Sequence, residues 1–205
     1  MLSDTIKFIG DFSISEYNAN GDLISSYSDK NLIMDAARKN MAELIAGLAN
    51  GKVINRFILG TRGHVGTDLL TPKAVGGAYT EGNFDSTRLK LYSELAPAGT
   101  PYWYVDFTPS PLGGASTTTN VFNSVNGSET LNDVSVSINV SGKETTYTVT
   151  VPVTSANNPA GPVAYTEAGL VSVSGGDVDL FSMKCFPARV KEDTVKLVIV
   201  WKIIF

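Results

Sequence analysis

The sequence is poor in the two residue types that most often carry metal or nucleophilic chemistry. Its 205 residues include one cysteine, Cys185, and one histidine, His64. A single cysteine excludes a disulfide within the chain and a zinc module built from several cysteines. A single histidine excludes motifs that need two histidines and leaves few ways to build a histidine-based triad. We therefore expect no catalytic residues, no bound metal and no cofactor.

Strong charge of one sign and long apolar runs are also missing. The 16 Lys and Arg against 20 Asp and Glu give a formal net charge of -4. This balance argues against broad electrostatic binding of nucleic acid. The longest apolar run near the C-terminus covers residues 197–201, whereas a membrane helix needs roughly 20 residues. Residues 1–4 show no basic region followed by an apolar stretch, so we expect no signal peptide. From the charge and the apolar runs we expect neither a membrane nor a nucleic acid as partner.

The residues that are abundant favour strands and turns. The chain has 20 Val and 19 Thr, which suit strands, and 19 Ser, 19 Gly and 14 Asn, which suit turns. Frequent turn signals in a strand-rich sequence are typical of a sandwich or a barrel. We expect a mainly β protein in which residues 1–205 form one jelly-roll-like β-sandwich domain. Two long loops or arms are expected at about 61–86 and 109–130.

Alternating apolar and polar residues predict individual strands. The clearest are a hairpin formed by 131–140 and 145–153, and a last strand from 195 to 205 whose odd-numbered residues are apolar. Further strands are expected at 6–17, 23–27, 53–60, 89–95, 102–108, 163–173 and 178–186.

One amphipathic helix near the N-terminus is predicted over 29–48. Ser28 or Asp29 is a suitable cap. Apolar residues cover about half of the helical wheel, from Leu32 to Leu48. A face of this width must lie against something, most simply the sheet, and a partner subunit is the alternative.

Few residues are candidates for catalysis or ligand binding, and most of them also have a purely structural interpretation. The glycines at 47–51 resemble a shortened phosphate loop, but they follow a helix and therefore suit a helix stop. Cys185 is expected to be a buried apolar residue. Carboxylates that a hydrolase could pair are Glu81, Asp85, Asp106 and Glu167, and nothing in the sequence selects two of them.

Other side chains are candidates for contacts with a partner. Arg62 and His64 follow a strand, and a loop histidine there fits a surface or an interface better than a catalytic site. The run Tyr102, Trp103 and Tyr104 could stack on a sugar or a nucleotide. On an alternating strand, however, Trp103 would face away from the two tyrosines, which favours packing. The full set of candidate contact residues is Arg62, His64, Tyr79, Phe84, Tyr102, Trp103 and Tyr104.

The layout of both ends of the chain is familiar. A hairpin over 12–23 leads to KNLI at 30–33, an Ala-rich helix ends in MAELIAG at 41–47, and INRFILGT follows at 54–61. Near the C-terminus come EAGL at 167–170, LFSMKCFPA at 180–188 and a long final strand. This layout resembles small virion proteins of tailed bacteriophages, from the neck, tail, baseplate or fibre-attachment region. The resemblance covers about half of the chain and leaves 61–130 unplaced.

The resemblance implies a β-sandwich subunit without enzymatic activity in a symmetric homo-oligomer, such as a collar or a ring in the neck or tail. Its partners would be copies of itself and other virion proteins, and its location the virion, assembled in the host cytoplasm. Alternatives are a carbohydrate- or receptor-binding module of a tail fibre or tip, with a surface glycan as partner, and a capsid decoration protein. An enzyme acting on polysaccharide is a further, weaker alternative.

Overall fold

The computed structural model describes residues 9–48, 52–73, 90–109, 116–125, 131–153, 162–175 and 177–205. Two helices and twelve strands occur in these ranges, and the prediction of a mainly β protein is confirmed. The elements are β1 (Ile9–Tyr17), β2 (Leu23–Ile33), α1 (Asp35–Ile45), β3 (Arg56–Gly60), β4 (His64–Val65), β5 (Asp68–Pro72), α2 (Tyr92–Leu95), β6 (Tyr102–Asp106), β7 (Ser116–Val125), β8 (Leu131–Ser141), β9 (Glu144–Val151), β10 (Val163–Ser174), β11 (Asp177–Lys191) and β12 (Lys196–Ile204).

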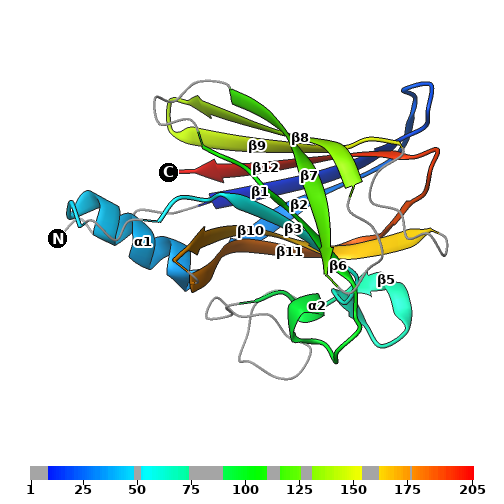
Figure 1. The fold of residues 1–205 in the computed structure, drawn as a ribbon, viewed down its shortest axis with the longest axis horizontal. Helices are drawn as coiled ribbons and strands as arrows, with labels where there is room; N and C mark the ends of the chain where they lie inside the picture. The colour runs from blue at the N-terminus through cyan, green and yellow to red at the C-terminus, as the bar shows by residue number, and fades with distance from the viewer. Residues whose placement is uncertain are drawn as a thin grey trace.

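Ten of the strands form one sheet that closes into a barrel, in the order β1-β12-β9-β8-β7-β6-β3-β10-β11-β2 (Figure 1). The closing pair is short: Leu32 and Ile33 of β2 pair with Met183 and Ser182 of β11. The prediction of a β-sandwich is not confirmed, because the strands form one continuous sheet rather than two facing sheets. Alternation tells which residues face the core, but it is the same for a sandwich and a barrel.

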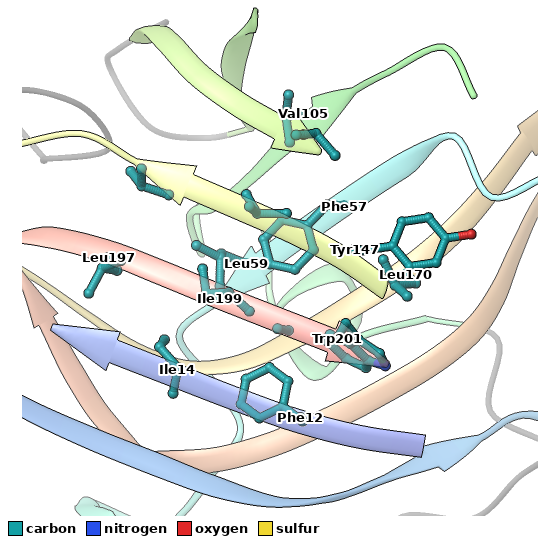
Figure 2. Close-up of a cluster of buried hydrophobic side chains, with 14 of the residues drawn as sticks. Phe12, Ile14, Phe57, Leu59, Val105, Tyr147, Leu170, Leu197, Ile199 and Trp201 are labelled. Atoms are coloured by element: carbon teal, nitrogen blue, oxygen red, sulfur yellow. The ribbon is translucent and has the colours of Figure 1, made fainter. Parts of the chain in front are cut away.

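The barrel interior is filled with side chains. On β12 every second residue is buried, from Leu197 to Ile203, as the alternation predicts. Trp201 packs edge-on against Phe12, with ring centroids 5.0 Å apart, and against Phe57 at 6.5 Å. Figure 2 shows these rings with aliphatic side chains from several strands around them. The interior is therefore a hydrophobic core that holds the ten strands together.

The helix is shorter than predicted and begins later. Residues 29–33, expected inside it, belong to β2, as does the predicted cap Ser28: Ser28 pairs with Ser13 and Asn31 pairs with Gly10 of β1. Helix α1 covers Asp35–Ile45, and Met34 caps it in an extended conformation. It packs against β11. Helical spacing of apolar residues continues back to Leu32, but pairing with β1 up to Asn31, and with β11 at Leu32 and Ile33, satisfies the backbone of this segment and decides its conformation.

The two predicted arms contain regular structure. Within 61–86, β4 and β5 form a small hairpin. Within 109–130, β7 is a barrel strand between β6 and β8. Its many Ser, Thr and Asn residues suggested a loop, but β7 gains its place through pairing on both sides. Tyr92–Leu95, predicted as part of a strand, form the short helix α2.

A second layer covers part of the barrel's outer wall. Apolar side chains from β3, β10 and β11 point outward there and pack against Leu91 and Tyr92. Hairpin β4–β5 lies on β11 nearby. We call α2 and the β4–β5 hairpin together the outer layer. It places residues far apart in the sequence around one buried carboxylate.

Candidate functional site

The buried carboxylate belongs to Glu167, in the middle of β10. The pairing of β10 with β11 is irregular between Tyr165 and Glu167. At this bulge Tyr165 faces the barrel core, whereas Thr166 bonds to the turn after β3 and Glu167 bonds to α2. A bulge re-aims side chains in this way by adding one residue to a strand. Glu167 is fully buried between the wall and the outer layer.

Three hydrogen bonds tie the Glu167 carboxylate to the start of α2. The backbone N–H of Tyr92 donates to Oε2 at 2.9 Å. The backbone N–H of Ser93 and its hydroxyl donate to Oε1 at 2.7 and 2.5 Å. The first N–H groups of a helix have no partner within the helix, so the carboxylate supplies the acceptor that the end of α2 lacks.

Ser93 and Thr166 extend this network to the turn after β3. The Ser93 hydroxyl oxygen accepts from the N–H of Thr61 at 2.8 Å and of Arg62 at 3.2 Å. The Thr166 hydroxyl accepts from the N–H of Gly63 at 2.9 Å. A Cβ at Gly63 would overlap the Thr166 carbonyl oxygen and the Glu167 side chain. Only glycine allows the turn to lie this close to the wall.

Burial governs the electrostatics of this cluster. It raises the pKa of Glu167, while the hydrogen bonds from Ser93 and Tyr92 act in the opposite direction. Burial also raises the pKa of Glu94, the residue that follows Ser93 in α2. Both Glu167 and Ser93 are closed off from solvent. A substrate could not reach them in this arrangement, so the cluster fastens the outer layer to the barrel.

Two of the predicted contact residues lie beside this cluster. The side chain of Arg62 is exposed, whereas His64 is buried at the start of β4. Burial lowers the pKa of His64, and the charges of Lys73 and Arg62 lower it further. Lys73 in turn lies over the Tyr92 ring, 3.6 Å from its centroid. His64 is therefore a buried, packed residue of the outer layer, and Arg62 is exposed at the surface.

The three predicted aromatic residues of β6 do not share a surface. Trp103 points into the barrel and packs edge-on against Tyr165, with ring centroids 5.2 Å apart. Tyr102 and Tyr104 lie on the outer wall and are half-buried. The Arg56 guanidinium lies 4.0 Å from the centre of the Tyr104 ring. The expectation that Trp103 faces away from the tyrosines is confirmed.

The remaining candidates are scattered. Cys185 is buried among apolar residues on the outer wall, as expected. Asp106 forms a two-pronged ion pair with Arg56, at 2.6 and 2.9 Å. Tyr79, Phe84, Glu81 and Asp85 lie outside the described residues. In the described ranges Glu167 is therefore not placed beside another of the candidate carboxylates.

An apolar cavity of about 240 Å³ lies at the end of the barrel nearest α1. Figure 1 shows α1 at the same end as the C-terminus. Four exposed apolar residues border the cavity, and we call them the apolar rim: Leu44, Val53, Val140 and Phe205. Just beyond the rim, Ile45 and Leu48 are 76% and 54% exposed. Exposed apolar side chains gathered in this way mark binding surfaces.

Sequence reasoning found only part of this second site. It identified the apolar face of the helix and named a partner subunit as one possible cover. The structure buries Ala37 and Asn40 of α1 against the barrel but leaves the C-terminal half of the apolar face open. The rim residues Val140 of β8 and Phe205, directly after β12, were not identified, because their position at the barrel end depends on strand pairing.

Comparison with known proteins adds no further information: no family model matches the chain, and neither a curated protein nor a solved structure is similar to it. Among the described residues, no helix has the length and apolar character required to cross a membrane. The same ranges contain no cluster of three or more His, Cys, Asp or Glu placed to hold a metal ion.

Proposed function

We propose that this chain is a non-enzymatic structural subunit of a tailed-phage virion, which assembles as a symmetric homo-oligomer in the neck or tail region. The resemblance at the two ends of the sequence suggests the class of particle. The observation that carries the proposal is the exposed apolar surface around the apolar rim, continued by Ile45 and Leu48 on α1. Burying such a surface against a second copy of the chain would stabilise an assembly.

The test is the mass of the purified protein in solution. We expect light scattering after size-exclusion chromatography to give a multiple of the 21.8 kDa chain mass. Ile45→Glu places a charge in the proposed interface, where burying an unpaired charge is costly, and we expect it to shift the protein towards the monomer. A matched control is Leu70→Glu, at a side chain that is 72% exposed. Leu70 belongs to β5, a strand that lies far from α1 in Figure 1.

The possible outcomes separate the parts of the proposal. A wild-type protein that stays monomeric at high concentration, and is absent from mass spectra of purified virions, would refute it. If Leu70→Glu dissociates the oligomer and Ile45→Glu does not, assembly stands but its interface lies on the outer layer. Circular dichroism of each variant checks that the barrel is still folded.

A second proposal is a receptor-binding or carbohydrate-binding module. Its support is the partly exposed pair Tyr102 and Tyr104, beside the exposed ion pair of Arg56 and Asp106. Planar polar groups next to aromatic rings are suited to sugars. A glycan array tests it: we expect binding that disappears in Tyr102→Ala, and a blank array with the assembled wild type argues against it. A capsid decoration role would appear as binding to capsids rather than to tails.

A further inference from the structure

The cavity at the α1 end of the barrel is large enough to hold a small molecule. Its volume is about 240 Å³, whereas an apolar cavity of about 150 Å³ is enough to bind benzene. Its wall is formed mainly by apolar side chains of α1 and the barrel, among them Ala37, Met41, Ile138 and Phe181. The mouth of a barrel is also a common place for such ligands. A six-membered ring with one substituent would fit.

One polar group in the lining forms no hydrogen bond with another described residue. Tyr147 of β9 is only 9% exposed and borders the cavity. None of the hydrogen bonds found among the described residues involves its hydroxyl, and burial raises the pKa of this group to about 12. Figure 2 shows the hydroxyl at the edge of the core, pointing away from the aliphatic side chains. This oxygen is not among the fully buried atoms that lack a partner in the described residues, so it faces accessible space and can serve a ligand as a neutral donor.

The charges near the cavity select against an anionic ligand. Lys52 is the charged residue among the described lining residues. Its ammonium group is 2.7 Å from a carboxylate oxygen of Asp179 and 3.5 Å from one of Asp177. Two carboxylates around one ammonium leave this side of the cavity with a negative balance. An acidic ligand would therefore be repelled, and an uncharged one would not.

We propose that this cavity binds a small uncharged apolar molecule whose oxygen atom, as a carbonyl, ether or hydroxyl, accepts a hydrogen bond from Tyr147. The apolar part would displace no strongly bound partner from the lining, and the single donor would fix its orientation. This site does not depend on assembly, because all of its lining comes from one copy of the chain.

Three compounds of similar size test the proposal: cyclohexanone, methylcyclohexane and cyclohexanecarboxylate. Binding is measured by protein-observed NMR and by calorimetry on the wild type and on the Ile45→Glu variant. We expect cyclohexanone to bind most tightly and the carboxylate most weakly. In Tyr147→Phe the affinity for cyclohexanone should fall about fivefold, the usual effect of one hydrogen bond, while that for methylcyclohexane stays unchanged. Tyr104→Phe, on the outer wall, is the matched control and should change neither.

Each contrary result overturns the proposal. If neither protein binds cyclohexanone at millimolar concentration, the cavity is not a ligand site. If the monomeric Ile45→Glu variant binds cyclohexanone and the assembled wild type does not, the natural occupant is a neighbouring copy. Equal losses for both neutral compounds in Tyr147→Phe would remove the role of the hydroxyl. Tightest binding of the carboxylate would refute the charge argument. Filling the cavity with Ala37→Phe should abolish binding of every compound.

Discussion

Removing the Glu167 carboxylate should detach the outer layer from the barrel. In Glu167→Ala the N–H groups of Tyr92 and Ser93 lose their acceptor while they remain buried. Each buried donor without a partner costs about 1–3 kcal/mol, so the two together cost about 2–6 kcal/mol. Part of this cost is offset, because the alanine variant no longer buries a carboxylate. Burial of that carboxylate is itself unfavourable, as the raised pKa of Glu167 indicates. We expect a net loss of about 3 kcal/mol.

Glu167→Gln separates the hydrogen bonds from the shape of the side chain. Its carbonyl oxygen can replace Oε1, which accepts both bonds from Ser93. The amide group then stands where Oε2 accepts from Tyr92, so one donor loses its acceptor. We expect a loss of about 1–2 kcal/mol, clearly smaller than for alanine.

Urea unfolding of both variants and of the wild type measures these losses, with Glu192→Ala as a control at an exposed glutamate. The control should stay within about 0.5 kcal/mol of the wild type. Hydrogen exchange then locates the effect: the amides of Tyr92 and Ser93 should lose protection, while that of Ile199 in the barrel keeps it. If Glu167→Ala is no more destabilising than Glu192→Ala, the reasoning about the anchor is wrong.

Three further predictions concern other parts of the structure. Gly63→Ala should lower the urea midpoint, since its Cβ would overlap the backbone of β10; an unchanged midpoint would show that the turn can move away. Trp103→Ala should cost about 3–5 kcal/mol, as for other buried aromatics, and Tyr104→Ala much less; equal losses in a thermal melt would contradict their assignment to opposite faces. Burial lowers the pKa of Lys191 to about 8, against an ordinary value of 10.5. Between these values the unfolded chain holds a proton that the folded chain has released, so wild-type stability should rise with pH relative to Lys191→Met. A pH-independent difference between the two proteins would refute this.

The local pattern of the sequence predicted those elements that one strand or one hairpin determines. The odd-numbered apolar residues of β12 face the core as expected, and β8 and β9 form the predicted hairpin. The start of the helix was wrong because Leu32 and Ile33 fit a helical stripe and a strand equally well. Their pairing with β11, about 150 residues further along the chain, decides between the two. Periodicity contains no information on such distant partners.

Glu167 shows the same limit for a site. The sequence offered it only as one of four carboxylates, although its position within the apolar segment 163–173 was a usable signal for burial. Its partners are 74 and 75 residues away, in a segment predicted as a strand. The bulge that turns it outward is defined by the register of β10 against β11, and that register depends on a strand pairing that local periodicity does not specify. A buried acid could thus be suspected from the sequence, but its role as an anchor required the fold.

Closure of the barrel restricts how copies of this chain can associate. In the closed sheet every barrel strand has a neighbour on both sides. Beyond the short β2–β11 pairing, the side chains of Lys184 and Arg189 reach across to Asp29 and Ser25, so little free strand edge is offered for joining two sheets. Much of the wall formed by β3, β10 and β11 is covered by the outer layer. The ends of the barrel remain, and the end at α1 combines the apolar rim with Ile45 and Leu48. An oligomer of closed barrels would therefore form most readily end to end or side to side through α1, which makes the charge introduced by Ile45→Glu the most direct probe of assembly.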